Sequence, residues 1–132
     1  MMYTKIIDPS IVIYNDYTNE FIGSAKFILT PESQDALLRL VNYNIIPASL
    51  LLMNLNFYQQ STYFDPPVLD QTVPRKGILR VIVVNDAGEQ IPMEIRLRYD
   101  ARARSNVSGS LTFFESAEYN NIEVDSIEEI VY

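Results

Sequence analysis

An unbroken alternation of apolar and polar positions between Ile91 and Asp100 constrains the fold most strongly. Its apolar positions are Ile91, Met93, Ile95, Leu97 and Tyr99. Successive side chains of a strand point to opposite faces, so this period of two predicts a strand with one face on the core. Arg96 and Arg98 then lie side by side on the other face.

A partner strand is predicted directly before this one. Residues 78–84 are apolar except for Arg80, which is typical of a strand covered on both faces. Asp86-Ala87-Gly88 supplies turn residues between the two runs. The two runs are therefore expected to form an antiparallel hairpin.

Further β-prone runs are spread along the whole chain. The runs at 10–14 and 21–29 are separated by Asx-rich residues and predict a second hairpin, in which Gly23 marks a bulge or a weak strand. A turn-prone stretch at 101–106 interrupts the later part. The remaining predicted strands cover 50–58, 107–115 and 121–131.

One helix is expected near 31–44. Thr30 can accept hydrogen bonds from free amides, Pro31 suits the first helical position, and Glu32 suits the positive end of the helix dipole. Leu37, Leu40 and Val41 then form one apolar stripe. A strand over 37–43 is the competing interpretation, since Leu38 and Leu40 also fit a period of two.

Regular patterning is lost between residues 59 and 77. Asp65-Pro66-Pro67 and Val73-Pro74 argue against a helix and against a central strand, because proline lacks the backbone N–H donor. Tyr63 and Phe64 make the segment too apolar for a plain linker. We expect an extended arm that packs either on its own domain or on a neighbouring subunit.

These elements predict a mainly β fold in a single domain over 1–132. The expected architecture is an antiparallel β-sandwich with one short helix near 31–44, an extended proline-containing arm at 59–77 and an acidic segment at 115–132. An immunoglobulin-like sandwich is one form of this expectation.

Charge and composition exclude several classes of function. The net charge of −7 and the pI of 4.4 disfavour a protein whose main task is to bind phosphates. The chain has no Cys and no His, so thiolate and imidazole chemistry are absent. Its apolar runs are too short for a membrane span or a secretion signal. We expect a cytoplasmic or virion protein that is not secreted, needs no cofactor or metal and does not contact a membrane.

The charge is unevenly distributed along the chain. Residues 115–132 contain six acidic residues and no basic one. Most basic residues lie in one window: Arg75, Lys76, Arg80, Arg96, Arg98, Arg102 and Arg104. The acidic segment either pairs with the protein's own basic strands, or the basic face binds an acidic partner such as a neighbouring copy.

The hairpin from Ile78 to Asp100, with IPMEIRLRYD as its second strand, resembles the matching hairpin of the γ-adaptin-type ear domain. The early run PSIVIY is similar to the first strand of that family. The resemblance implies an immunoglobulin-like sandwich that recruits short acidic-aromatic peptides, with Arg96 and Arg98 as binding residues. The helix at 30–44 and the arm at 59–76 depart from the family pattern.

The sequence favours a non-enzymatic structural or assembly subunit, and among such proteins a virion component of the head, connector or tail. An adaptor-ear-like peptide-recruiting domain and a nucleic-acid-binding module are the alternatives. Partners would be other copies of the chain or neighbouring subunits. The candidate partner-binding residues are Arg80, Arg96, Arg98, Tyr63 and Phe64.

Overall fold

The computed structural model describes residues 2–51, 55–58, 71–105 and 112–131. It contains one helix, α1, and seven strands, which are joined in a single antiparallel sheet. The elements are β1 (Tyr3–Asn15), β2 (Phe21–Lys26), α1 (Pro31–Tyr43), β3 (Ser49–Leu51), β4 (Leu55–Tyr58), β5 (Gln71–Asn85), β6 (Gln90–Ser105) and β7 (Thr112–Glu129).

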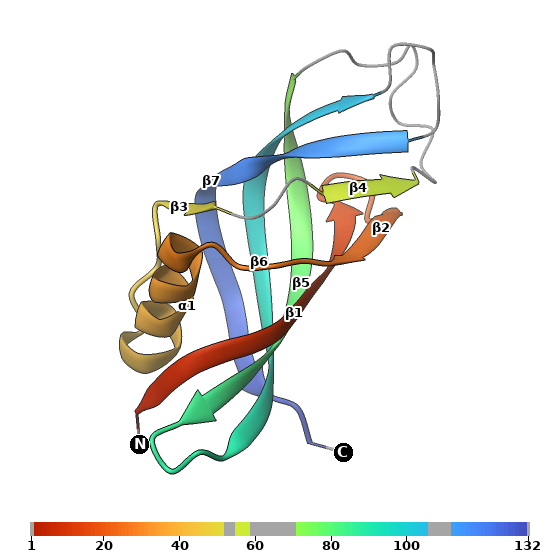
Figure 1. Ribbon diagram of the computed structural model, residues 1–132. Helices are drawn as coiled ribbons and strands as arrows, with labels where there is room; N and C mark the ends of the chain where they lie inside the picture. The colour runs from red at the N-terminus through yellow and green to blue at the C-terminus, as the bar shows by residue number, and fades with distance from the viewer. Residues whose placement is uncertain (1, 52–54, 59–70, 106–111, 132) are drawn as a thin grey trace.

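The sheet has the strand order β2-β1-β5-β6-β7-β3, and β4 also pairs with β7. It curls into a half-barrel, in which β2 comes close to β4 (Figure 1). The mainly β antiparallel prediction is thus confirmed. The predicted sandwich is not confirmed, because the described strands pair in one continuous sheet that folds around its own core.

Helix α1 covers the open side of the half-barrel beside β1 and β3 (Figure 1). It begins as the sequence predicts, since the Thr30 hydroxyl accepts the Ser33 N–H and Pro31 occupies the first turn. It ends at Asn44 in the left-handed conformation. The helix interpretation is therefore confirmed over the competing strand, and Leu37 and Leu40 face the core.

Two side-chain contacts attach α1 to the sheet. Asn42 Oδ1 accepts the Tyr3 N–H at 2.8 Å, and Asn42 Nδ2 donates to the Tyr3 carbonyl at 2.9 Å. The Asn42 amide thereby hydrogen-bonds the N–H and the C=O of Tyr3, the two groups that would otherwise pair with an adjacent strand. At the other end of the helix, the Thr30 hydroxyl donates to the Leu51 carbonyl of β3 at 3.2 Å.

Both predicted hairpins are confirmed, and in each the turn begins at a buried asparagine. Asn15 Oδ1 accepts the N–H groups of Tyr17 and Thr18 after β1. Asn85 Oδ1 accepts those of Ala87 and Glu89 after β5. An Asn side chain that accepts from residues a few positions ahead stabilises a tight turn.

Several sequence-based boundaries were wrong, since β1 begins at Tyr3 rather than at residue 10 and β2 ends at Lys26 rather than at residue 29. The arm predicted over 59–77 is too long, because β5 already begins at Gln71; residues 59–70 lie outside the described part. The turn predicted at 101–106 is absent up to Ser105, where β6 ends. The strands predicted at 107–115 and 121–131 are continuous in the described part, where one strand, β7, runs from Thr112 to Glu129; residues 107–111 lie outside it.

Pro74 is accommodated in β5 because its nitrogen, which carries no hydrogen, faces away from β6. Its carbonyl faces the β1 side and accepts the Asp16 N–H at 3.4 Å, just beyond the last β1 pair at Asn15 and Arg75. The N and C=O of a strand residue face the same side, so no β6 hydrogen bond is lost. β5 thus includes Val73-Pro74, but at Pro74 its strand neighbour among the described strands is β6 alone, which agrees with the exclusion of a strand flanked on both sides.

Candidate functional site: the outer face of the sheet

The outer face of the sheet, which points away from the core, carries the three basic residues predicted to bind a partner, Arg80, Arg96 and Arg98. Met93, Ile95, Leu97 and Tyr99 of β6 are buried, whereas Arg96 and Arg98 between them are exposed. Cross-strand register places Lys76 opposite Arg98 and Ile78 opposite Arg96. The alternation read from the sequence thus positions both arginines correctly.

Arg98 is bound by two carboxylates of β7. Its guanidinium lies 2.8 Å from Glu123 Oε2, and its Nε and Nη2 donate to Asp125 at 3.2 Å. The hydrogen bond to Asp125, followed by the charges of Asp125 and Glu123, raises the pKa of Arg98 above its ordinary value. This part of the acidic segment therefore pairs with the protein's own basic strand.

Arg80 and Arg96 share a single carboxylate. Glu94 Oε2 accepts from Arg80 Nε at 3.2 Å, and Glu94 Oε1 accepts from Arg96 Nε at 2.9 Å. The Glu94 side chain is 13% exposed, while both arginines are more than half exposed. Glu128 of β7 lies opposite Glu94 on the same face but forms no ion pair with a described residue, so the two arginines share one direct carboxylate partner.

We expect Glu94→Gln to lower the free energy of unfolding by about 1 kcal/mol, because two charge-assisted hydrogen bonds are weakened at a partly buried acceptor. Urea unfolding followed by circular dichroism measures the change. Glu123→Gln is the matched control and should cost less, since that side chain is 66% exposed. An equal loss of stability in both variants would contradict a larger contribution from Glu94, the partly buried carboxylate that pairs with two arginines.

A pocket of about 340 Å³ opens on the outer face beside these arginines. Lys76 and Arg96 contribute its cations, and Lys76 Nζ donates to Asn19 Oδ1 at 2.6 Å. Lys76 forms no ion pair with any residue that the structure describes. The lining residues are Tyr14, Asn19, Lys76, Gly77, Ile78, Arg96 and Asp125.

Tyr14 supplies an aromatic wall that sequence reasoning missed. Tyr99, the aromatic residue nearest to Arg96 and Arg98 in the sequence, is buried on the opposite face, as the alternation predicts. Tyr14 reaches the pocket from β1, where it is paired with Lys76 in register. Its ring contacts Phe21 edge-on, with the ring centroids 6.0 Å apart. No signal within β5 or β6 could have revealed this neighbour.

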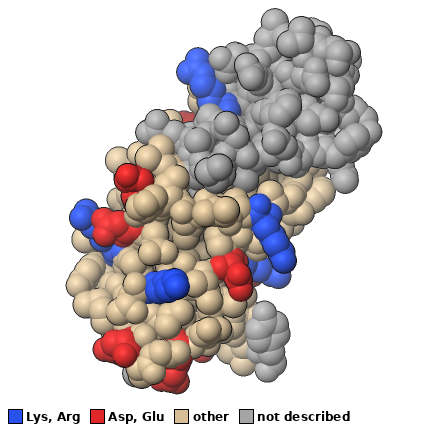
Figure 2. Space-filling view, viewed as in Figure 1, with Lys and Arg blue, Asp and Glu red and all other residues tan. Residues whose placement is uncertain are grey.

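The basic window does not form one continuous basic patch. Arg75 is fully buried on the inner face, in register with Tyr99, so it cannot bind an acidic partner on the surface. In the view of Figure 2, basic and acidic side chains are interspersed. This arrangement differs from the concentrated positive surface that nucleic-acid binding requires.

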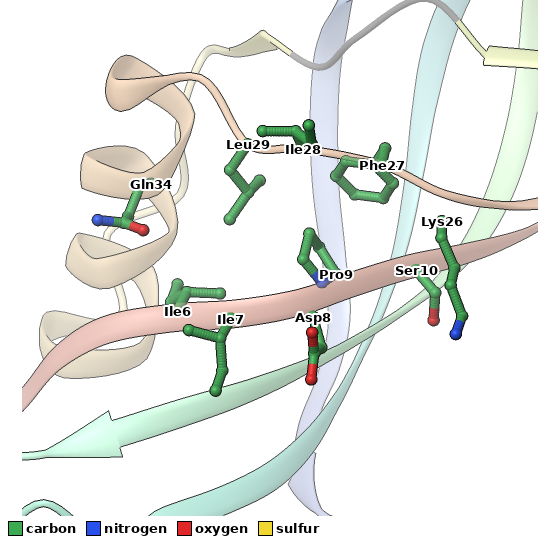
Figure 3. A pocket seen from close by; sticks show the side chains of 10 residues that line it. All are labelled: Ile6, Ile7, Asp8, Pro9, Ser10, Lys26, Phe27, Ile28, Leu29 and Gln34. Atoms are coloured by element: carbon green, nitrogen blue, oxygen red, sulfur yellow. The ribbon is translucent and has the colours of Figure 1, made fainter.

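A second pocket, of about 530 Å³, lies beside an irregularity in β1 (Figure 3). There the pairing register with β5 shifts between Ile7 and Ser10, and Asp8 adopts a positive φ of 51°. Phe27, Ile28 and Leu29 lie across from β1, with Gln34 of α1 at one end and Lys26 at the other. The lining of the pocket is about equally polar and apolar, and its two charged residues, Asp8 and Lys26, form no ion pair with each other.

An exposed apolar cluster surrounds the end of α1. Tyr43 and Met2 are 60% and 42% exposed, and the Tyr43 hydroxyl lies 3.7 Å from Met2 Sδ. Ile45 and Ile46 follow the helix and are 53% and 49% exposed. We call Met2, Tyr43, Ile45 and Ile46 the apolar cluster. Its signal in the sequence is the pair of isoleucines directly after the residues that end the helix.

The structure brings three of the five predicted partner-binding residues onto one face. Arg80, Arg96 and Arg98 lie there, but Arg98 is already bound by two carboxylates. Tyr63 and Phe64 lie outside the described residues, so their predicted role remains a prediction.

Comparisons with known proteins supply no relative from which a function could be transferred. No known protein family, curated protein or solved structure matches this chain. Within the described ranges, no three acidic side chains converge on a metal-sized space, and no helix is long and apolar enough to cross a membrane. The geometry of the surface is therefore the basis for the proposals below.

Proposed function

We propose that this protein is a non-enzymatic structural subunit that assembles with neighbouring protein subunits. The apolar cluster at the end of α1 is the observation that carries this proposal. Its four large side chains are between 42% and 60% exposed. Exposed apolar residues that occur singly are ordinary, whereas several gathered at one helix end, as Met2 beside Tyr43 with Ile45 and Ile46 next along the chain, are typical of a protein–protein contact.

The composition and position of the cluster suit an interface core. Tyrosine, methionine and aliphatic side chains lose unfavourable hydration when a partner covers them, and tyrosine and methionine are enriched in interfaces. The cluster also lies where α1 is attached to β1 through Asn42. A partner would thus meet a surface held in place by the sheet.

Within this class we favour a virion component of the head, connector or tail. The β-rich fold and the sequence without Cys or His support a structural role over a catalytic one. The expected location is the cytoplasm or the virion. The partners would be neighbouring subunits or other copies of the chain.

The test removes apolar surface without disturbing the core. In Tyr43→Ser/Ile46→Ser, both replaced side chains are about half exposed or more, so the fold should be retained. We expect association with the native complex, measured by co-sedimentation of the tagged full chain, to weaken about tenfold or more, as for loss of interface anchor residues.

Tyr17→Ser/Ile28→Ser is the matched control. These side chains are 72% and 75% exposed and lie outside the apolar cluster, so the control removes similar residue types elsewhere. It should associate like the unmodified protein. Equal association of both double variants, with unchanged circular dichroism, would contradict the proposed interface.

A further inference from the structure

We infer that the pocket beside Lys76 and Arg96 binds the acidic segment Glu128–Val131 of a second copy of this chain. This inference rests on the assembly function proposed above and names a separate contact, away from the apolar cluster. It follows from the charge of the pocket, from its apolar walls and from the exposure of the segment.

Two cations, Lys76 and Arg96, and one carboxylate, Asp125, line the pocket. Glu94 is shared between Arg80 and Arg96, and Lys76 has a neutral amide, Asn19, as its hydrogen-bond partner. Asp125 lines the pocket but is bound by Arg98. A carboxylate placed between Lys76 and Arg96 would therefore gain two cationic partners. A phosphate dianion is less suitable, because it would bring a second negative charge close to Asp125.

The walls of the pocket select an apolar group next to that carboxylate. Tyr14 is held by its edge-on contact with Phe21, and Ile78 is half-buried beside it. A ligand that pairs an acidic side chain with an aliphatic one would use both features: the cations orient it, and the apolar walls exclude water.

The chain itself carries a segment of this chemistry. Glu128 and Glu129 are exposed and form no ion pair with any described residue. Ile130 and Val131 follow them, and Val131 is 88% exposed. The order of two acidic and then two aliphatic residues matches the requirement of the pocket.

The segment does not reach Lys76 in its own copy, because Glu128 pairs with Glu94, four residues along β6 from Arg98, the cross-strand partner of Lys76. Ser126 pairs with Arg96, and β7 then continues along β6 toward Pro92, whose carbonyl accepts the Ile130 N–H at 2.9 Å. Pro92 lies four residues from Arg96, or about 13 Å along the strand. The pocket extends the opposite way, toward Lys76. The contact with Lys76 is therefore made by a second copy, and because the pocket and Glu128 lie on the same face of the sheet, two copies can make it reciprocally in a dimer.

Reciprocal charge reversal tests the contact on the full chain. Sedimentation velocity over a range of concentrations should show self-association of the unmodified protein that weakens with added salt. Lys76→Glu should weaken it about tenfold or more, as should Glu128→Lys/Glu129→Lys, because like charges then face each other. Mixing the two variants should restore association, since each supplies the surface that the other lacks.

Controls separate charge from folding. Lys5→Glu makes the same charge change at an exposed residue outside the pocket and should associate normally. The milder Lys76→Gln should weaken association less than Lys76→Glu, and both should keep the native circular dichroism spectrum. If Lys76→Glu unfolds the chain, Lys76→Gln alone must still weaken association for the inference to stand.

Three outcomes would overturn the inference. One is an unmodified protein that stays monomeric at every concentration, and another is a mixture of the reversed variants that does not associate. The third is binding of a synthetic Glu-Glu-Ile-Val peptide at the pocket without self-association, which would assign the pocket to a different protein. None of these results changes the Tyr43→Ser/Ile46→Ser test, so the assembly function can stand or fail separately.

Discussion

Replacing Leu37 by alanine is expected to lower the free energy of unfolding by about 3 kcal/mol. Leu37 is fully buried on the face of α1 that covers the half-barrel. The substitution removes apolar area from the core and leaves a cavity that a sheet closed by a single helix can fill only in part. Guanidinium unfolding, followed by far-ultraviolet circular dichroism, measures the loss.

Leu38→Ala provides the comparison for this prediction. Leu38 follows Leu37 on the same helix but is only half-buried, so the same chemical deletion creates little cavity. We expect it to cost clearly less than Leu37→Ala. Similar losses for the two variants would show that α1 does not pack through the face that we describe.

Replacing Asn85 by alanine is expected to cost about 2 kcal/mol. The buried Asn85 amide accepts two backbone N–H groups of the β5–β6 turn, at 3.0 and 2.9 Å, and donates to Glu89 at 3.3 Å. Alanine leaves these turn donors without their acceptor, and partly buried donors that lose a partner are costly. Thermal unfolding should show a lower midpoint with no change in the native spectrum.

Asn120→Ala is the control for Asn85→Ala. Asn120 lies on β7 with its side chain exposed, so the same deletion there should change stability by less than about 0.5 kcal/mol. If the two substitutions had the same effect, the buried amide would not be what holds the turn. Asn15 forms a comparable turn after β1, and Asn15→Ala should behave like Asn85→Ala.

Local patterns predicted the hairpins and the helix well because they depend on residues close in sequence. The alternation from Ile91 to Tyr99 gave the buried face of β6 correctly, and Thr30 begins α1 as expected. Two interruptions were predicted wrongly: a turn from residue 101 and a gap between strands at 116–120. Both came from giving turn-prone residues more weight than strand pairing. Extensive pairing between β6 and β7 keeps both strands extended there.

The sequence predicted the face on which the basic residues of the candidate site lie, but not their neighbours from other strands. Sequence periodicity placed Arg96 and Arg98 on one face, but Arg98 is bound by Asp125, which is 27 residues away. Tyr14 and Lys76 meet across the β1–β5 pair, 62 residues apart by their numbers. Neither contact follows from local spacing, since each depends on strand order and register.

The amino-acid sequence alone determined where strands alternate, where the main turns lie and how α1 starts and stops. These features depend on side-chain direction and backbone hydrogen bonding within a few residues. The tertiary structure decided that one curled sheet encloses the core, that Glu94 serves two arginines, and that Lys76 keeps its charge unpaired among the described residues. Those outcomes depend on which strands become neighbours, because only neighbouring strands bring distant charges within a few ångströms.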